Sequence, residues 1–174
     1  MPSPVGHTLA ALTVYALAAP RDYPWPDRRS LAVVVGSALA PDLDLLLRLV
    51  DGRNHHQAES HSVGAAMLAG LLVWLGARVL RWPRAGWLGL LATLGWTSHL
   101  LLDYLGRDTH PPIGLMALWP FSSGYFKLPW PLFLDIGRTL HWETLRNNAL
   151  AVAWETLLLL PLTVWVVWRR LQEH

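Results

Sequence analysis

Apolar residues gather in five long segments of this chain, and polar stretches separate them. Each segment has the length and composition of a helix, and none alternates between apolar and polar positions as a half-buried strand does. The segments cover residues 4–19, 31–50, 62–80, 85–105 and 149–168. This pattern predicts an all-α bundle of four to five helices.

Prolines and acidic residues divide the pattern further. A Pro-Asp-Leu-Asp sequence at residues 41–44 breaks the second segment, and we expect Glu155 and Pro161 to interrupt the last one. Residues 106–148 hold several clusters of proline and tryptophan, which are too many breakers for a helix to pass through. We expect this stretch to be a long Pro/Trp-rich loop that covers a functional site.

Composition and segment length point to a membrane. Segments 62–80 and 85–105 are almost free of charge, and a bilayer span needs about 20 apolar residues. The chain is 53% hydrophobic and 15% charged, whereas soluble domains carry about 25% charged residues. Its 174 residues fit one domain, 1–174. We therefore expect an integral membrane helical bundle in contact with the lipid bilayer, and a soluble bundle of short amphipathic helices is the alternative.

The basic residues predict how the chain crosses the membrane. If each segment crosses once, three groups of arginines share one side, and basic residues beside spans favour the cytoplasm. These groups are Arg21, Arg28 and Arg29; Arg78, Arg81 and Arg84; and Arg169 and Arg170. The opposite side would then hold the candidate ligands and six further cations: Arg48, Arg53, Arg107, Lys127, Arg138 and Arg146. We expect a multi-pass protein of the cell inner membrane with its site on the non-cytoplasmic side.

Several classes of function are excluded by what the chain lacks. It has no cysteine, which removes disulfides, thiolate metal ligands and a cysteine nucleophile. Its formal charge of +2 is too small, and its arginines too scattered, to indicate a nucleic-acid partner. No GxSxG, P-loop, GxGxxG or HExxH motif is present. The first apolar run has no charged region before it, so we expect the first helix to be retained rather than cleaved.

His99 and Asp103 form an HxxxD motif near the end of segment 85–105. Residues four apart share one face of a helix, so an imidazole and a carboxylate can reach the same ion. The alternative is a buried His–Asp hydrogen bond.

His56 and His61 precede segment 62–80, and Ser60 is a candidate N-cap for that helix. We expect His61, at the start of an apolar span, to be a ligand. The alternative is a polar loop, in which His55 is expected to be solvated.

Four other polar residues lie in or beside apolar segments. Asp42 and Asp44 are two apart and do not share a helical face, so we expect one to be a ligand and the other to bridge, orient a histidine or cap a turn. A loop with both acids in water is the alternative. His7 alone is more typical of a polar cap. Glu155 inside an apolar segment is a functional candidate, or a structural hydrogen-bonding partner.

Together these motifs resemble the YdjM-like family of inner-membrane metal-dependent hydrolases. The family pattern is an early GH, a PDxD, an HR-x-x-THS-like element and a SHLLLD-like element. Here these read as residues 6–7, 41–44, 56–62 (HQAESHS) and 98–103, and residues 108–126 and Glu155 also look like the family. One departure is Gln57, where an arginine that could contact an anionic substrate is usual. The family is distantly similar to zinc-dependent phospholipase C and single-strand nuclease enzymes, which are helical and use His/Asp clusters.

The resemblance and the motifs lead to one expected site. Nitrogen and oxygen ligands favour Zn²⁺, with Mn²⁺ or Fe²⁺ as alternatives. Asp42 is expected to bridge or to act as a general base, and Asp44 to orient a ligand; both are the candidate catalytic residues. The resemblance also implies Glu155 and Asp108 as residues behind the ligands. The expected metal ligands are His7, Asp42, His56, His61, His99 and Asp103.

The expected function is a membrane-bound hydrolase in which a divalent ion activates water against a phosphoester. The substrate would be a small-molecule or lipid phosphoester, and we favour a phospholipid-type substrate at the membrane surface. The alternative is a non-enzymatic membrane protein whose His/Asp cluster binds a structural metal or handles protons or other ions.

Overall fold

The computed structural model describes residues 1–20, 25–52 and 54–172, and within them the chain is helical with no named strand. Two isolated β-bridges occur in the long loop, Gly106–Phe133 and Leu115–Phe126. The all-α prediction is therefore confirmed. The main helices are α1 (Pro4–Ala18), α2 (Arg28–Leu39), α4 (Val63–Val79), α5 (Ala85–Leu105) and α6 (Trp142–Gln172).

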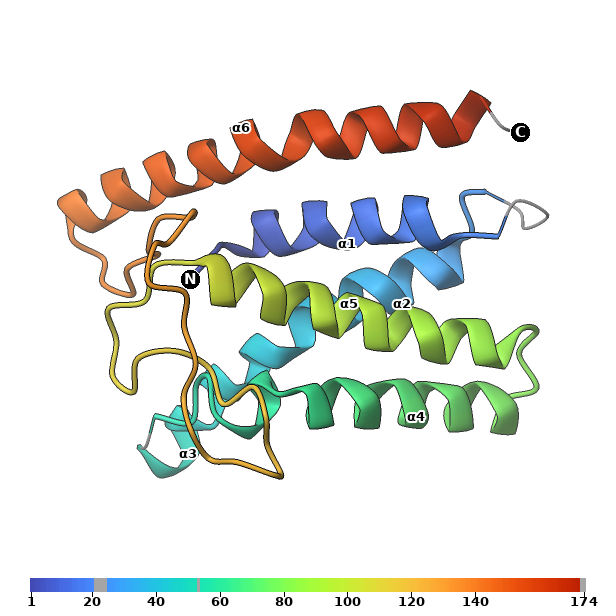
Figure 1. Cartoon of the computed structure of the whole chain (residues 1–174), viewed down its shortest axis with the longest axis horizontal. Helices are drawn as coiled ribbons and strands as arrows, with labels where there is room; N and C mark the ends of the chain where they lie inside the picture. The colour runs from blue at the N-terminus through green and yellow to red at the C-terminus, as the bar shows by residue number, and fades with distance from the viewer. Residues whose placement is uncertain (21–24, 53, 173–174) are drawn as a thin grey trace.

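Helix α5 lies at the centre of the bundle and packs against α1, α2 and α4, while α6 packs on the outer side of α1 (Figure 1). Small residues allow the close contacts of α5. A Cβ on Gly70 of α4 would lie 2.8 Å from the Gly89 carbonyl oxygen and 1.9 Å from Thr93 Oγ1. The α4 and α5 backbones can approach this closely because glycine has no side chain, as is common between membrane helices.

The expected break at residues 41–44 is confirmed. Helix α2 ends at Leu39 and is followed by the 3₁₀ turn η1 (Ala40–Leu46) and then by the short helix α3 (Arg48–Asp51). Proline at position 41 has no N–H to donate, so a tighter turn replaces the α-helical pattern. The turn places Asp42 and Asp44 at the end of α2 that lies against α5.

Two sequence expectations about the last helix are wrong. The loop does not extend over 106–148, because α6 begins at Trp142, and neither Glu155 nor Pro161 interrupts it. The first two turns of α6 carry mostly polar and exposed residues, so the apolar pattern does not reveal them. Pro161 lies within the helix, as prolines do in some membrane helices.

The outer surface of the bundle is apolar. Three helical stretches are long and apolar enough to cross a membrane, namely Arg28–Asp51, Ala85–Leu105 and Trp142–Gln172, and α1 and α4 are shorter apolar helices. Leucines on the outer faces of α4 and α6 are exposed, including Leu68, Leu72, Leu157 and Leu162. An exposed apolar surface of this extent fits contact with lipid.

The helix ends fall into two groups at opposite ends of the bundle (Figure 1). One group holds the end of α1, the start of α2, the turn between α4 and α5, and the end of α6. It carries Arg28, Arg29, Arg78, Arg81, Arg84, Arg169 and Arg170, and we call it the arginine end. The other group holds the start of α1, the end of α5 and the long loop, and we call it the site end. Arg21 and Arg53 lie outside the described residues.

Candidate metal centre

Helix α5 supplies the fully buried pair His99 and Asp103, one turn apart at the site end. His99 Nδ1 donates to the Ala38 carbonyl oxygen at 2.8 Å. Because a carbonyl only accepts, this contact puts the proton of the neutral ring on Nδ1 and leaves the lone pair of Nε2 facing Asp103. The ring is therefore held in the form that can bind a metal ion.

The turn η2 (Glu59–His61) places the buried His61 directly before α4. The expected N-cap Ser60 is wrong, because Ser62 caps α4 by accepting from Ala65 N at 3.0 Å. Ser60 instead donates to Asp44 Oδ2 at 2.6 Å, and its carbonyl accepts from Trp96 Nε1 at 2.8 Å. The His61 side chain points inward, with its Nε2 3.1 Å from His99 Nε2 of α5.

The two aspartates of η1 face different sides of the histidines. Asp44 lies behind them, with Oδ1 at 2.7 Å from His56 Nδ1 and Oδ2 at 3.1 Å from His61 Nδ1. Asp42 lies in front, with Oδ1 at 3.8 Å from His61 Nε2 and 3.6 Å from His99 Nε2. Asp44 therefore orients both imidazoles, and Asp42 faces the space onto which His61 and His99 point.

Three ligand atoms form a nearly equilateral triangle at this place. His61 Nε2 and His99 Nε2 are 3.1 Å apart, and Asp103 Oδ2 lies 3.3 and 3.2 Å from them. A tetrahedral zinc site with bonds of about 2.0–2.1 Å has ligand–ligand distances of about 3.3–3.4 Å. The triangle therefore has the size of one face of such a site, with a further position left for water or substrate.

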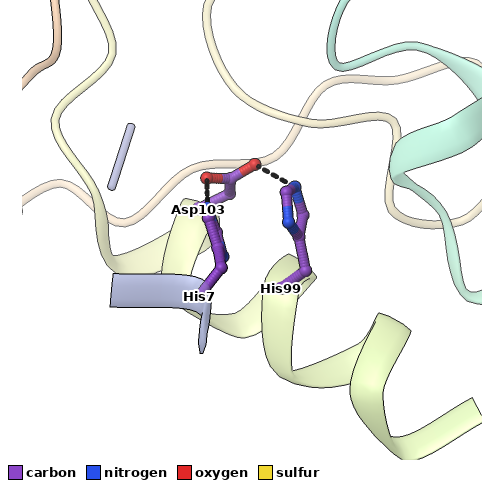
Figure 2. A group of neighbouring side chains, drawn as sticks. All are labelled: His7, His99 and Asp103. Atoms are coloured by element: carbon purple, nitrogen blue, oxygen red, sulfur yellow. Dashed lines mark ion pairs between the residues drawn. The ribbon is translucent and has the colours of Figure 1, made fainter. Parts of the chain in front are cut away.

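His7 adds a second imidazole beside Asp103. Its Nε2 lies 3.6 Å from Asp103 Oδ1, and its ring stacks on that of His99 with centroids 3.8 Å apart. Figure 2 shows the Asp103 carboxylate spanning the two rings, one oxygen toward His7 and the other toward His99. The carboxylate can thus serve ligand sets on both of its sides.

Most of the buried polar side-chain atoms without a hydrogen-bond partner among the described residues lie in this centre. Among the described residues, His7 Nδ1 and Nε2, Asp42 Oδ1 and both Asp103 carboxylate oxygens are buried without a hydrogen-bond partner. Buried polar groups are normally paired, because an unpaired one costs about 1–3 kcal/mol. A cation would serve the three carboxylate oxygens and the unprotonated nitrogen of His7 together.

The electrostatics of His61 agree with this need for positive charge. Burial alone would lower the pKa of His61, but the nearby carboxylates of Asp103, Asp42 and Asp44 outweigh it and raise the pKa well above its ordinary value. The carboxylates therefore favour a positive charge here, whether as a proton on His61 or as a divalent ion that replaces it.

The predicted ligands divide into two groups that could each hold an ion. One group is His7, His99 and Asp103, and the other is Asp42, His56 and His61, with the ligand atoms of each within 4.8 Å of one another. The groups adjoin through the short His61–His99 contact. The structure thus brings all six predicted ligands into one buried cluster.

His56 lies at the edge of that cluster. Its Nδ1 is taken by Asp44, and its Nε2 lies 2.6 Å from the Met1 sulfur. It contacts the ring of His61 edge-on, with centroids 4.8 Å apart.

Two predicted residues lie away from the cluster. Glu155 accepts from Ser3 N at 2.9 Å and from Ser3 Oγ at 2.5 Å, so it holds the start of α1 rather than a histidine. Asp108 accepts from His110 N at 3.0 Å and Gly114 N at 2.8 Å, which shapes the loop. Glu155 therefore acts on His7 only through α1, and Asp108 shows no contact with the cluster.

Gln57 is buried under the loop, with a positive φ of 64°. When the Gln57 side-chain amide is oriented with its nitrogen toward these acceptors, the nitrogen donates to Asp108 Oδ2 at 2.8 Å and to the Gly114 carbonyl at 3.0 Å. Backbone bonds from Met116 N to Gln57 O and from Val63 N to Ala117 O tie the loop to the approach to α4. Gln57 is thus a structural residue beneath the loop.

Sequence reasoning missed Ser60, Ser3 and the Ala38 carbonyl. Ser60 could have been found from its place next to His61, but a main-chain carbonyl leaves no signal in a sequence.

Comparison of the sequence with known protein families shows what kind of protein carries this centre. The model of the YdjM inner membrane protein family matches residues 1–173. The chain belongs to the YdjM inner membrane protein family. No curated protein and no solved structure matches the chain. Membership of YdjM agrees with the three membrane-length helical stretches.

Proposed function

We propose that this YdjM protein is a membrane-bound metal-dependent hydrolase that acts on a phosphoester at the membrane surface. The observation that carries the proposal is the triangle of His61 Nε2, His99 Nε2 and Asp103 Oδ2, with sides of 3.1–3.3 Å. Three protein ligands with one further position open are typical of catalytic rather than structural zinc sites. Zn²⁺ suits these ligands, and Mn²⁺ or Fe²⁺ are the alternatives.

The chemistry follows from the position of each side chain. A divalent ion in such a site lowers the pKa of water toward about 7 and polarises a phosphoryl oxygen. Asp42 has 24% of its side chain exposed, whereas Asp103 has none, so Asp42 is the carboxylate that solvent and substrate reach. We assign Asp42 the role of accepting the proton of the attacking water.

The other residues hold the arrangement in place. The Ala38 carbonyl accepts from His99 Nδ1 and Asp44 accepts from His56 Nδ1, which fixes these two tautomers. Ser60 Oγ donates to Asp44 and lies 2.9 Å from His61 Nδ1, from which it can accept. His7 and His56 extend the ligand set on either side. Because the site lies opposite the arginine end, the basic-residue rule puts it on the non-cytoplasmic side.

Elemental analysis of the detergent-purified protein tests the proposal. We expect the wild type to hold at least one equivalent of zinc, manganese or iron, and the His99→Ala/Asp103→Ala variant to hold none. The matched control is Asp51→Ala/His55→Ala, which removes an exposed Asp–His pair with the same four-residue spacing. This control should retain the metal.

The same preparations are then assayed for hydrolysis of bis-p-nitrophenyl phosphate and of phospholipids. Metal-dependent turnover in the wild type and the control, absent from the His99→Ala/Asp103→Ala variant, is the expected result. A folded wild type that binds none of these metals, even when they are added, would overturn the proposal. Metal binding without any turnover would leave a structural site in its place.

A further inference from the structure

Two neighbouring cavities open at the site end, beside the candidate metal centre. One has a volume of about 480 Å³ and lies between the start of α6 and the long loop. The other has a volume of about 510 Å³ and lies between the loop and α3. They share His110, Arg138 and Thr139 as lining residues, so they form one groove.

The groove is strongly cationic. Arg107 lines the first cavity, Arg48 the second, and Arg138 both. All three of these arginines are exposed, and none of their guanidinium groups has an ion-pair partner among the described residues. The one carboxylate in the lining, Asp135, accepts from Thr109 Oγ1 and lies 3.7 Å from His110 Nδ1. Three guanidinium groups therefore face one carboxylate that is already engaged.

The remaining lining suits an anion attached to an apolar group. Asn54, Asn147 and Thr139 add uncharged polar groups, while Leu134 and Leu150 give the first cavity an apolar wall. Guanidinium groups bind phosphate through two parallel hydrogen bonds, which makes arginine well suited to this ligand. The chemistry of the groove is that of a phosphate site with room for a hydrocarbon neighbour.

One side chain separates the groove from the histidines. Arg138 Nη2 lies 4.0 Å from the Met1 sulfur, which in turn lies 2.6 Å from His56 Nε2. His56 Nδ1 bonds Asp44, which also orients His61. A ligand anchored at Arg138 would therefore lie beside Met1 and close to His56, at the edge of the histidine cluster.

We propose that the groove formed by Arg48, Arg107 and Arg138 binds the phosphate of an anionic ligand next to the centre. The identification of this ligand as the substrate rests on the proposed function, whereas its binding does not. The phosphate belongs either to a lipid headgroup or to a soluble phosphate compound, and the two sources can be distinguished experimentally.

Binding is measured by calorimetry on the protein in maltoside detergent. The probes are dihexanoyl phosphatidylglycerol, dihexanoyl phosphatidylcholine and inorganic phosphate. We expect saturable binding of phosphatidylglycerol, of phosphate or of both, and an Arg107→Gln/Arg138→Gln variant should bind at least about tenfold more weakly, as the loss of charged hydrogen bonds predicts. The Arg107→Lys/Arg138→Lys variant keeps the charge and should recover part of the affinity.

The matched control is Arg28→Gln/Arg78→Gln, which removes two exposed charges at the arginine end and should bind like the wild type. Repeating the titrations with His99→Ala/Asp103→Ala separates the two proposals, because the groove should bind its ligand without the centre. Binding of phosphatidylglycerol alone identifies a lipid headgroup, and equal binding of inorganic phosphate identifies a soluble compound. No saturable binding to the wild type, or equal weakening by both glutamine pairs, overturns the inference.

Discussion

The two ends of the helix bundle differ in whether their charged groups lie at the surface or are buried. At the arginine end, most charged groups lie near the surface and two stack on exposed aromatic rings, Arg29 over Trp82 at 5.1 Å and Arg169 over Trp165 at 5.4 Å, while Arg170 is buried and donates to the Pro20 carbonyl. At the site end, Asp44, Asp103 and four imidazoles are buried together. Most charges of the arginine end can reach water or lipid headgroups, whereas the site end gathers buried carboxylates and imidazoles, several of whose polar atoms have no hydrogen-bond partner among the described residues.

This contrast teaches where to look for function in a membrane bundle. A charge near the end of a span can reach the interface with its long side chain at little cost. Buried aspartates have no such route, because their side chains are short and the surrounding helices exclude water. A chain keeps such groups when they act together.

Of the changes considered, metal removal should have the largest effect, and it acts on the site end and not on the arginine end. We expect dialysis against a chelator to abolish hydrolysis and to lower the thermal unfolding temperature, with both restored by Zn²⁺. A ligand present at a thousand times its Kd stabilises a protein by about 4 kcal/mol. Differential scanning fluorimetry in detergent measures the shift, and an unchanged unfolding temperature together with unchanged turnover would contradict the metal centre.

The Asp42→Asn substitution should lower turnover by about 10²–10⁴-fold, as expected when a general base is lost. The metal content should stay the same, because His61, His99 and Asp103 remain. Steady-state hydrolysis and elemental analysis on one preparation measure both quantities, with Asp51→Asn as the exposed control. Loss of folding instead of loss of turnover would assign Asp42 a structural role.

The Asp44→Asn substitution should weaken metal affinity by about 10–100-fold, since Asp44 accepts from His56 Nδ1 and from Ser60 Oγ, which lies beside His61 Nδ1. Competition with a chromogenic chelator measures this affinity. The control is Asp108→Asn, which changes a buried aspartate that bonds only the loop. Equal effects of the two substitutions would show that Asp44 acts through general stability.

The Gly6→Ala substitution should destabilise the fold by about 1–3 kcal/mol, as overpacking does. Its Cβ would lie 2.7 Å from Glu155 Oε2 and would displace the carboxylate that holds the start of α1. At the arginine end, a Cβ on Gly86 meets nothing within 4 Å, so Gly86→Ala should be neutral or stabilising by up to about 1 kcal/mol. Urea unfolding in detergent compares the two, and equal stabilities would contradict the packing argument.

The fold was predictable where the local pattern and the packing agree. The predicted bounds of α5 are those observed, because a Pro83-Arg84 turn precedes it and Gly106 ends it. The start of α6 was not predictable, since its first turns are polar and face outward. Its continuity through Pro161 was not predictable either, because proline usually ends or kinks a helix.

The candidate site was predictable as a set of residues but not as an arrangement. Order and spacing selected His7, His61, His99 and Asp103 from distant segments, and the structure brings them together. Which of Asp42 and Asp44 faces the centre depends on a 3₁₀ turn, because the two would point differently on an α-helix. The stacking of His7 on His99 likewise depends on how α1 packs against α5.

Pro41 has a consequence on both sides of the histidine cluster. In a 3₁₀ pattern, the Ala38 carbonyl would accept from the N–H of residue 41, but a proline has none. That carbonyl accepts instead from His99 Nδ1, while the turn that follows carries the carboxylates that contact His61. Pro41 therefore influences which nitrogen of His99 carries the proton. It also influences the direction in which Asp42 and Asp44 point. Because His99 and the two aspartates of η1 both depend on this position, a substitution of Pro41 should disturb both parts of the centre at once.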